Sequence, residues 1–320
     1  AYEIVSRDWS SDVCSSDLIN SGNCRILYPM SIRDLHFVDD KGNSVKGNGR
    51  QIVSDDDNLP VGRAVGADYK LIDNKSIWDS VQAGLAGTKH EVVSCGTVND
   101  RSLGFVSIKI VDDFKAANRQ TKSVMNVLWG HGGNKAVIAR SGFTVVVCQN
   151  TYNAAMAEDS DFKLSIRHTA KADVLDLSKA IDAHIGVVAE FKAAMDSLDS
   201  VDADAEKARK IYTGFLSGGE TPDTKTGISR LTNSVDDMVT LFRVGLGNAG
   251  RTMADVFNGA TDYYSHESSG GRSNAWKQFV SSEFGSGNTR KSEFFDVLMS
   301  PASLAETVKR GEKVMMELGV

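Results

Sequence analysis

The sequence predicts an α+β fold, with a mostly antiparallel sheet and a few helices followed by a helical C-terminal part. Residues 91–97 and 103–111 read as a hairpin, and the second run alternates apolar and polar side chains, as a strand with one buried face does. After residue 169, apolar residues recur every three or four positions, as on one side of a helix. We therefore expect a sheet domain over residues 19–169 and a helical part over residues 170–320 that packs on it.

Turn and capping residues predict the first elements of the sheet domain. Asp39–Asn43 is a turn signal between two extended runs, and Asn74 or Ser76 is placed to cap a helix. Residues 114–128 are compatible with another helix and lead into a glycine-rich loop at residues 130–134. This loop lacks the P-loop spacing and is not followed by a helix, which argues against a nucleotide-phosphate site.

The stretch Lys135–Thr169 contains the densest structural signals. Its valines form an apolar run that is typical of a strand covered on both faces, and polar residues gather near the ends of the predicted elements, where sites tend to lie. In order, we predict a strand at Lys135–Ala139, a turn at Arg140–Gly142, a strand at Phe143–Cys148, a helix capped by Asn150 over Tyr152–Glu158, and a short strand that ends in Arg167-His168-Thr169.

The helical part is predicted from its amphipathic periodicity. Acids in a first turn and capping side chains mark several helix starts. The predicted helices are Val174–Leu198, Asp202–Leu216, Ser229–Val244, Thr252–His266, Trp276–Phe284, Ser292–Met299 and Pro301–Leu318, with loops at Ser217–Gly227 and Ser286–Lys291.

Basic residues concentrate before and within the central stretch. The chain has a net charge of −6, yet residues 101–140 hold seven bases and two acids. A basic sheet face with glycine-rich loops suits the phosphate backbone of nucleic acid, and Trp129, Phe143 or Tyr152 could stack on bases. A solvated face balanced by neighbouring acids explains the pattern equally well. The predicted phosphate contacts are Lys109, Lys135, Arg140 and Arg167, with Arg119 and Lys122 secondary.

Isolated cysteine and histidine residues indicate no site on their own. Of the four cysteines, Cys14 belongs to the suspect segment of residues 1–18 that is described below. The other three, Cys24, Cys95 and Cys148, are odd in number and lack CxxC spacing, which argues against disulfides and a zinc cluster and for the reducing cytoplasm of a bacterial host. His131 is interpreted as a loop-tip residue rather than a catalytic base, and His184 as a packed side chain. No apolar run reaches the length of a membrane span, and we expect no membrane association, metal or other cofactor.

Residues 1–18 do not resemble a protein segment. Back-translation of Ala1–Leu18 gives two strings that match the constant parts of a short-read sequencing adapter, with a variable index at Ile4–Arg7. We therefore expect the genuine chain to begin near Ile19 and to come from an assembled environmental, metagenomic sequence. A Ser- and Asp-rich disordered N-terminus is the alternative. Without the four acids and one base of this segment, the net charge of −6 becomes −3, too close to neutral for a global charge argument.

Two sequence blocks resemble a known family. The first is VVCQNTYNAAM at residues 146–156, followed by IRHT at residues 166–169, and the second is FNGATDYYSH at Phe257–His266. In order and spacing they resemble the domain of unknown function 932 family of phages and plasmids, over about Pro60–Met299. The resemblance implies a phage- or plasmid-associated protein, and it carries over no catalytic residue.

The two blocks supply the polar residues of a second candidate site, although the sequence departs from the family pattern at Gly259, where Ala is expected, and at Ser265, where Asp is expected. In the second block the polar residues fall on one side of a helix. They suit a hydrogen-bonded contact between helix and sheet, which we favour, or a polar site, or less readily a metal site. This family-motif polar cluster comprises Asn150, His168, Asn258, Asp262 and His266.

Three functions are compatible with these observations. The predicted order of helix, hairpin, helix, hairpin and helix is similar to the single-strand annealing proteins of phage recombination, in which a curved sheet and a helix line a basic groove and subunits form rings. We therefore expect, first, a non-enzymatic protein that binds single-stranded DNA, as a homo-oligomer. The second is a hydrolase-type enzyme in which His168, Asp262 and His266 converge. The third is a helical accessory or assembly protein whose long helices pair with a protein partner, which a large exposed apolar strip on Val174–Leu198 would favour.

Overall fold

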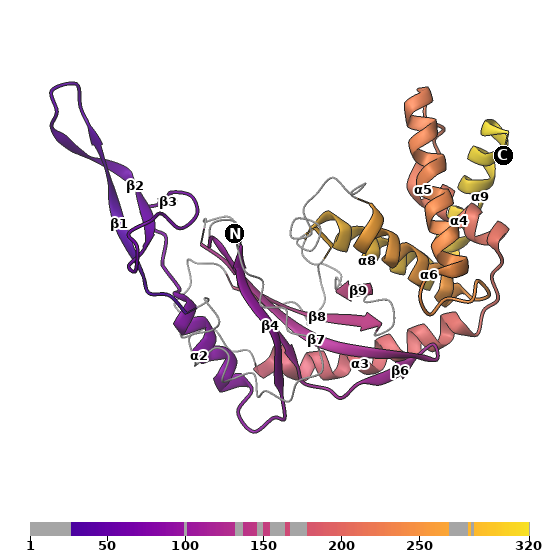
Figure 1. The fold of residues 1–320 in the computed structure, drawn as a ribbon, viewed down its shortest axis with the longest axis horizontal. Helices are drawn as coiled ribbons and strands as arrows, with labels where there is room; N and C mark the ends of the chain where they lie inside the picture. The colour runs from indigo at the N-terminus through magenta and orange to yellow at the C-terminus, as the bar shows by residue number, and fades with distance from the viewer. Residues whose placement is uncertain are drawn as a thin grey trace. The chain divides into compact units, whose positions relative to one another are not determined.

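The computed structural model describes residues 27–98, 101–131, 137–145, 150–153, 164–166, 178–268, 281–282 and 285–319. Strands precede helices along the chain, which confirms the predicted α+β class (Figure 1). In chain order the elements are β1 (Met30–Val38), β2 (Ser44–Ser54), β3 (Val65–Gly66), α2 (Asn74–Gly84), β4 (Glu91–Val98), β5 (Leu103–Lys109), β6 (Phe114–Ala116), β7 (Arg119–Gly130), β8 (Val137–Val145), β9 (Asn150–Asn153), β10 (Leu164–Ile166), α3 (Ser178–Asp199), α4 (Ala205–Ser217), α5 (Lys225–Val244), α6 (Met253–Asp262), the π-helix η2 (Tyr263–Glu267), α8 (Ser286–Met299) and α9 (Pro301–Leu318).

Two compact units divide the chain, and each combines segments that are distant in sequence. Unit 1 comprises residues 1–112, 124–141 and 157–186, and unit 2 comprises residues 113–123, 142–156 and 187–320. Strands β7 and β8 and helix α3 contribute residues to both units. Neither unit is therefore a continuous stretch of sequence.

The first described elements of unit 1 form a hairpin in which β1 pairs antiparallel with β2, and β3 pairs with β2 in turn. Asp39 holds the connecting turn, because its carboxylate accepts the backbone N–H groups of Lys41 and Asn43 at 2.9 and 2.8 Å. The predicted turn is confirmed. The hydrophobic cluster beside this small sheet comprises Tyr28, Ile52, Val61 and Val65.

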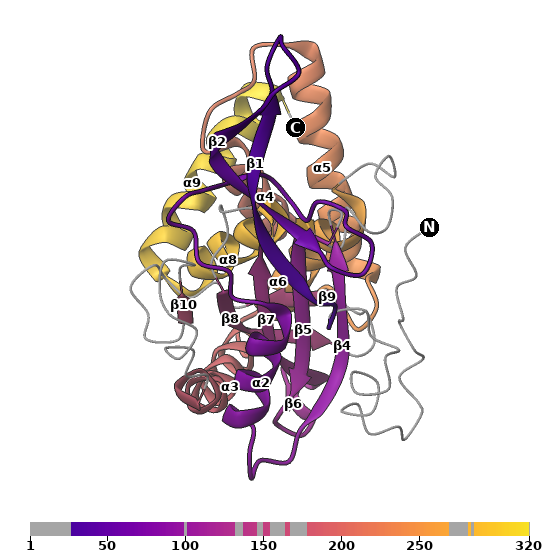
Figure 2. The same ribbon diagram turned by 90° about the vertical axis from the view of Figure 1, so that its left-hand side faces the viewer.

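The main sheet follows the strand order β10-β8-β7-β5-β4, with β6 paired to β7 and β9 paired to β8 (Figure 2). In unit 1 one face of this sheet is apolar and packs on α2, whose N-terminus is capped by Asp73. The cap therefore lies one residue before the predicted Asn74. The core residues are Ile77, Trp78 and Val81 of α2, Val106 and Ile108 of β5, Met125, Val127 and Trp129 of β7, Val137 and Ala139 of β8, and Ala180 and Ile181 of α3.

His131 is buried, so its interpretation as a loop-tip residue is wrong. The indole Nε1 of Trp129 donates a hydrogen bond to Oδ1 of Asn74 at 2.7 Å, and Nε2 of His131 lies 2.7 Å from the same oxygen. Since an amide oxygen only accepts hydrogen bonds, Nε2 of His131 carries a proton. These contacts tie the end of β7 to the start of α2.

His184 is a packed histidine, as predicted. It belongs to the α3 segment of unit 1, it is 1% exposed, and its Nδ1 lies 2.8 Å from Oγ of Ser141 in β8. Burial lowers the pKa of His184 from 6.5 to about 4, because the imidazolium would lose its hydration.

Acidification is therefore expected to destabilise unit 1 between pH 6.5 and about 4. In that range the unfolded chain binds a proton at His184 that the folded chain does not bind, so the free energy of unfolding falls as the pH falls. The expected loss at pH 4 relative to pH 7 is about 2 to 3 kcal/mol, since one pKa unit corresponds to about 1.4 kcal/mol. Urea unfolding at the two pH values measures this loss, and His184→Gln should remove it. An unchanged pH dependence in the variant contradicts the assignment to His184.

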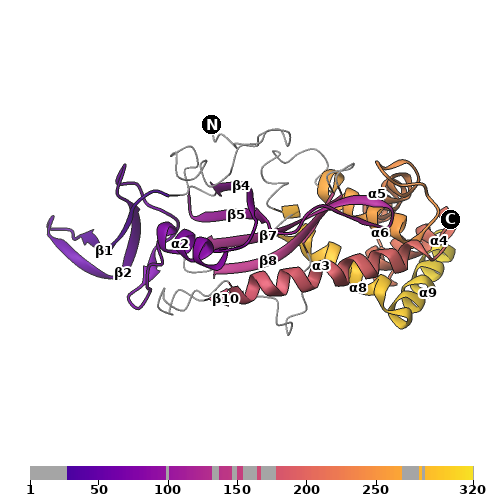
Figure 3. The same cartoon turned by 90° about the horizontal axis from the view of Figure 1, so that it is seen from below.

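Unit 2 is built from helices around an aromatic core. Phe143 of β8 stacks on Phe191 of α3 with ring centroids 4.0 Å apart, and Phe294 of α8 lies 5.8 Å from Tyr212 of α4. Helices α4 and α9 lie side by side (Figures 1 and 3).

The predicted helices that correspond to α3, α4, α5, α6 and α9 are confirmed. Within the described residues, no helix is sufficiently long and apolar to cross a membrane.

The predicted helix over residues 114–128 is wrong. The segment forms β6 and most of β7, joined by a two-residue turn at Ala117 and Asn118, whose φ angles are 48° and 58°. Positive φ at both central residues is typical of the type I′ turn, whose twist suits a hairpin. The segment also contains β-branched residues, such as Val124 and Val127, that favour strands.

The predicted turn at Arg140–Gly142 is also wrong, because β8 runs unbroken from Val137 to Val145. Strand β10 pairs with residues 137–139 and β9 pairs with residues 142–145. Neighbouring strands thus hold both halves of β8 extended, and this pairing overrides the local turn preference of Ser-Gly.

Three further predictions are corrected. Asn150, predicted as a helix cap, begins strand β9, so no helix starts at Tyr152. Residues 286–291, predicted as a loop, form the first turns of α8. Cys95 in β4 is disulfide-bonded, against the expectation that the cysteines are unpaired. The predicted helix at residues 276–284 lies mostly outside the described residues.

Candidate functional site

Helix α6, the π-helix η2 and helix α8 form the frame of a candidate site in unit 2. Strand β9 lies against both α6 and α8 (Figure 1). The first sequence block contains β9, and the second contains most of α6 and of η2. The fold therefore brings together two blocks that are far apart in the sequence.

The local sequence determines where α6 begins and how it ends. Oγ1 of Thr252 accepts the Asp255 N–H at 3.3 Å, and the Asp255 carboxylate accepts the Thr252 N–H at 3.2 Å, which is a capping box. After Asp262 the helix continues as a π-helix over Tyr263–Glu267. Such π-helical turns are rare and frequently occur at functional sites.

The polar side chains of this frame are buried rather than solvated. On α6 and η2, Asn258 is 2%, Asp262 9% and Ser265 8% exposed. On α8, Asn288 is 2% exposed and Lys291 is 0% exposed. Burial of polar groups is costly unless they are hydrogen-bonded, so the contacts among them determine whether this arrangement is stable.

Lys291 joins η2, α8 and residue Ser282 through hydrogen bonds. Its Nζ donates to Oγ of Ser282 at 2.7 Å and to Oγ of Ser265 at 3.0 Å. The two serine hydroxyls lie 3.4 Å apart, with Ser282 as donor. These three polar groups are hydrogen-bonded to one another, and we name them the Ser282–Lys291–Ser265 triangle.

Part of the predicted His/Asp site is also present. The carboxylate of Asp262 lies 3.9 Å from Nε2 of His266, whose side chain is 45% exposed. His168 lies outside the described residues, and Asn150 is described only as part of the β9 backbone. In the part of the chain that the structure describes, no three His, Cys, Asp or Glu side chains are grouped as metal ligands.

One family model matches most of the chain. The family model described as Domain of unknown function (DUF932) matches residues 63–297. The chain belongs to the DUF932 family. The match includes β9, α6, η2 and nearly all of α8. No curated protein and no solved structure matches the chain.

Gly259 and Ser265, the two positions at which we expect this DUF932 chain to depart from the family pattern, both contact neighbouring helices. A Cβ atom at Gly259 would lie 2.7 Å from Oη of Tyr212 and 2.9 Å from the backbone nitrogen of Phe242, so α6 approaches α4 and α5 too closely for the expected Ala. At Ser265 the hydroxyl accepts a hydrogen bond from Lys291, where the expected Asp would offer a carboxylate.

The six predicted phosphate contacts are spread over the chain. Four lie among the described residues, and their side chains are only partly exposed. Lys109 and Arg140 belong to unit 1, Arg119 and Lys122 belong to unit 2, and Lys135 and Arg167 lie outside the described residues.

In unit 1, Lys109 and Arg140 lie on the same face of the sheet. Their neighbours Ile108 and Ala139 belong to the apolar core that packs on α2. Side chains alternate between the two faces along a strand. Lys109 and Arg140 therefore lie on the face opposite α2.

Arg119 is engaged in contacts within unit 2. Its guanidinium forms an ion pair with Asp255 and donates hydrogen bonds to the backbone oxygens of Gly247 at 2.9 Å and Ala117 at 3.1 Å. The Arg119 side chain is 9% exposed and that of Asp255 is 2% exposed. The structure thus gives Arg119 a role in holding the β6–β7 turn against the start of α6.

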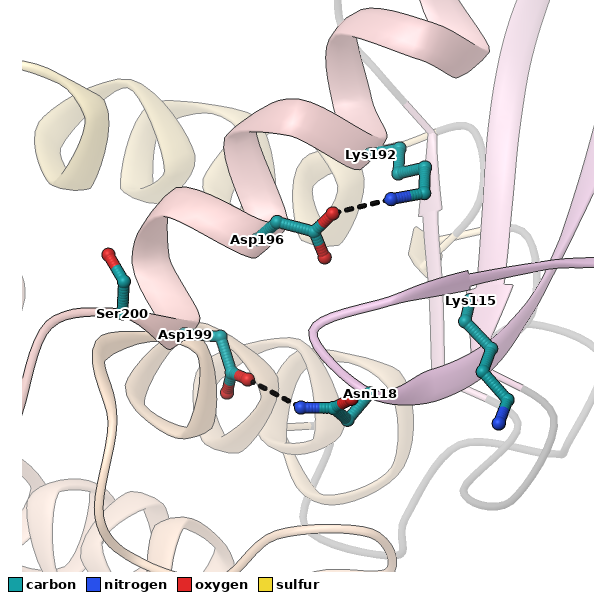
Figure 4. A pocket seen from close by; sticks show the side chains of 6 residues that line it. All are labelled: Lys115, Asn118, Lys192, Asp196, Asp199 and Ser200. Carbon is teal, nitrogen blue, oxygen red and sulfur yellow. Dashed lines mark hydrogen bonds and ion pairs between the residues drawn. The ribbon is translucent and has the colours of Figure 1, made fainter.

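A surface cleft of about 480 Å³ lies beside this turn and the end of α3 (Figure 4). Nδ2 of Asn118 donates to Asp199 at 3.2 Å, and Nζ of Lys192 donates to Asp196 at 2.5 Å. Lys192 and the N–H of Ala117 hold the pKa of Asp196 below its ordinary value. Because these carboxylates are already hydrogen-bonded within the protein, we assign no ligand to the cleft.

Sequence reasoning does not find Lys291, because residues 286–291 read as a loop, and it does not find Ser282, because nothing distinguishes this serine within the predicted helix at residues 276–284. The only signal in the sequence is the spacing of Asn288, Lys291 and Ser292, which places these polar residues on one side of a helix. Nothing in the sequence places this side against η2.

Proposed function

We propose that this DUF932 protein binds single-stranded nucleic acid through the sheet face of unit 1 that lies opposite α2. The observation that supports this most directly is the placement of Lys109 and Arg140 on that face. Phosphate groups attract such cations whatever the base sequence. The mechanism is electrostatic capture of the backbone, with bases held for pairing to a second strand. In a phage or plasmid, such binding would serve recombination.

A buried hydrogen bond joins two strands of the same face. Oγ of Ser107 in β5 donates to Oδ1 of Asn126 in β7 at 2.5 Å, and these side chains are only 8% and 3% exposed. The proposal therefore gives the phosphate contacts to the two cations and not to these groups. Burial lowers the pKa of Arg140, but its ordinary value is so far above 7 that the guanidinium stays charged.

Removing both cations is expected to weaken binding and to flatten its salt dependence. Each phosphate contact with a single strand contributes about 0.7 to the slope of log K against log salt, so Lys109→Gln with Arg140→Gln should lower the slope by about 1.4. Fluorescence anisotropy of a labelled oligothymidylate, titrated with the full chain over a salt series, measures the slope.

A matched variant separates a local from a general charge effect. Lys75→Gln with Lys89→Gln removes the same charge from exposed positions in unit 1, where the side chains are 75% and 92% exposed. This control should leave the slope unchanged. An equal slope in the wild type and the Lys109/Arg140 variant rejects this face as the binding site, and an absence of binding at low salt rejects the proposed function.

A further inference from the structure

Strand β1 forms one edge of the small sheet of unit 1 (Figure 1). Among the described residues it pairs only with β2, so its outer side has no strand partner in that part of the chain. The unpaired N–H and C=O groups of such an edge can pair with a strand of another chain. Near the end of β1, Phe37 is 61% and Val38 is 76% exposed, so this edge also leaves apolar surface uncovered.

We propose that β1 is a dimerisation edge, at which two copies of this chain pair β1 with β1 in antiparallel orientation. A two-fold axis perpendicular to the sheet passes beside Leu35 and places it opposite the partner's Leu35. The two small sheets then become one continuous sheet. The same register places Ile32 opposite the partner's Val38, so that the two apolar side chains cover each other.

On one face of β1, this register pairs an acid with a histidine. Asp34 lies opposite the partner's His36, and by symmetry His36 lies opposite the partner's Asp34. Within the chain, Nδ1 of His36 lies 3.0 Å from Oγ of Ser44, which leaves Nε2 to donate to the partner's carboxylate. Asp34 already accepts from Nζ of Lys46 at 2.6 Å, but a carboxylate can accept from more than one donor.

On the other face of β1, the same register pairs a cation with an aromatic ring. Arg33 lies opposite the partner's Phe37, and an arginine against an aromatic ring is a favourable pair. The guanidinium of Arg33 uses its edge for the ion pair with Asp55 at 3.3 Å, so its flat side remains for the ring. The Phe37 ring lies on Gly47 of β2, where an added Cβ would overlap it, and most of the ring surface is still exposed.

The neighbouring registers do not match in this way. Residues that lie opposite each other in a sheet point to the same face, so the two-fold axis passes beside a residue and not between two residues. An axis at Arg33 or at Asp34 would bring two like charges directly opposite each other, which is destabilising. An axis at His36 would place the carboxylate of Asp34 against the partner's Val38. The axis at Leu35 avoids all three conflicts, so the side chains of β1 select this register.

Cysteine cross-linking of the full chain tests the contact and its register. Leu35→Cys places a thiol opposite its own copy, where paired Cα atoms lie about 4.5 to 5.5 Å apart, within the range of a disulfide. We therefore expect a disulfide-linked dimer on a non-reducing gel after mild oxidation. The wild-type chain, oxidised in parallel, gives the background from the native cysteines.

The matched control is Arg33→Cys on the same strand. Its two copies would lie about 13 Å apart along the paired strands, so this variant alone should not cross-link above the background. A mixture of Arg33→Cys chains and Phe37→Cys chains should cross-link, because these positions lie opposite each other. Cross-linking of Leu35→Cys no stronger than that of Arg33→Cys, or of neither variant above the background, overturns the proposal.

A charge exchange tests the Asp34–His36 pairs without a new cysteine. A single strand pair is a small interface, so the wild type should be a reversible dimer in sedimentation velocity over a dilution series. Asp34→Lys removes both pairs and should raise the dissociation constant of the dimer about tenfold. Adding His36→Asp brings opposite charges back together across the axis and should restore most of the affinity. It also supplies a carboxylate opposite Lys46 within the chain.

These experiments do not depend on nucleic-acid binding. Lys109→Gln with Arg140→Gln, which should weaken that binding, should leave the dimer unchanged. A wild type that stays monomeric at every concentration, or an Asp34→Lys variant that dimerises as well as the wild type, overturns the proposed interface and leaves the nucleic-acid proposal untouched.

Discussion

Replacing Arg119 by methionine is expected to lower the free energy of unfolding of unit 2 by about 3 to 5 kcal/mol, the usual cost of breaking a buried ion pair by removing one partner. The variant leaves the Asp255 carboxylate, 2% exposed, without its cation. It also leaves the carbonyl of Gly247 without the hydrogen bond from Arg119. The N–H groups of Arg251 and Thr252 still donate to Asp255, at 2.8 and 3.2 Å, so the lower end of the range is expected.

Hydrogen exchange measured by mass spectrometry can localise this loss. We expect faster exchange in α6 and in the end of α3, and unchanged exchange in α2, which belongs to unit 1. Urea unfolding supplies the free energy. The control is Arg290→Met, which removes an exposed pair with Glu293 and should cost at most about 1 kcal/mol. Equal losses of unfolding free energy in the two variants would show that the buried Arg119–Asp255 ion pair stabilises the protein no more than the exposed Arg290–Glu293 pair.

A second substitution separates the ion pair from the packing of the arginine stem. Adding Asp255→Asn to Arg119→Met removes the buried charge that the single variant leaves behind. Because the two residues are in contact, their effects should not add, and the double variant should be destabilised by less than the sum of the single variants. Additive losses would contradict a direct interaction between them.

The elements with strong local signals were predicted from the sequence, and those set by tertiary pairing were not. Helices α3 and α5 show apolar residues at three- and four-residue spacing, and the Asp39–Asn43 turn has its own side-chain hydrogen bonds. By contrast, the β6–β7 turn uses Ala117 and Asn118 and lacks the glycine that usually marks a type I′ turn. The local sequence of this region is therefore compatible with a helix.

The candidate site was predictable only in part. The spacing within Phe257–His266 predicts polar side chains on one side of a helix, and the structure confirms this helix. The partners of that side, Ser282 and Lys291, come from a separate segment, and only the packing of α8 on η2 brings them close. Periodicity describes one element at a time, so it cannot show which face of another element will meet it.

The same substitution, Gly→Ala, is expected to have opposite effects at two helical positions of this chain. At Gly311 in α9, an added Cβ would overlap the carbonyl oxygen of Lys210 in α4 and lie 3.1 Å from the backbone nitrogen of Gly214. These are backbone atoms, so the overlap can be relieved only if α4 and α9 move apart. At Gly186 in α3, nothing lies within 4 Å of an added Cβ.

Gly311→Ala should therefore lower the free energy of unfolding by about 3 kcal/mol, the upper part of the range for overpacking, even though Ala is intrinsically the better helix former by about 1 kcal/mol. Gly186→Ala meets no obstacle and should gain up to that 1 kcal/mol. Urea unfolding of both variants measures the difference. If Gly311→Ala were as stable as Gly186→Ala, α4 and α9 would not be in backbone contact, and the packing of the last helix would have to be different.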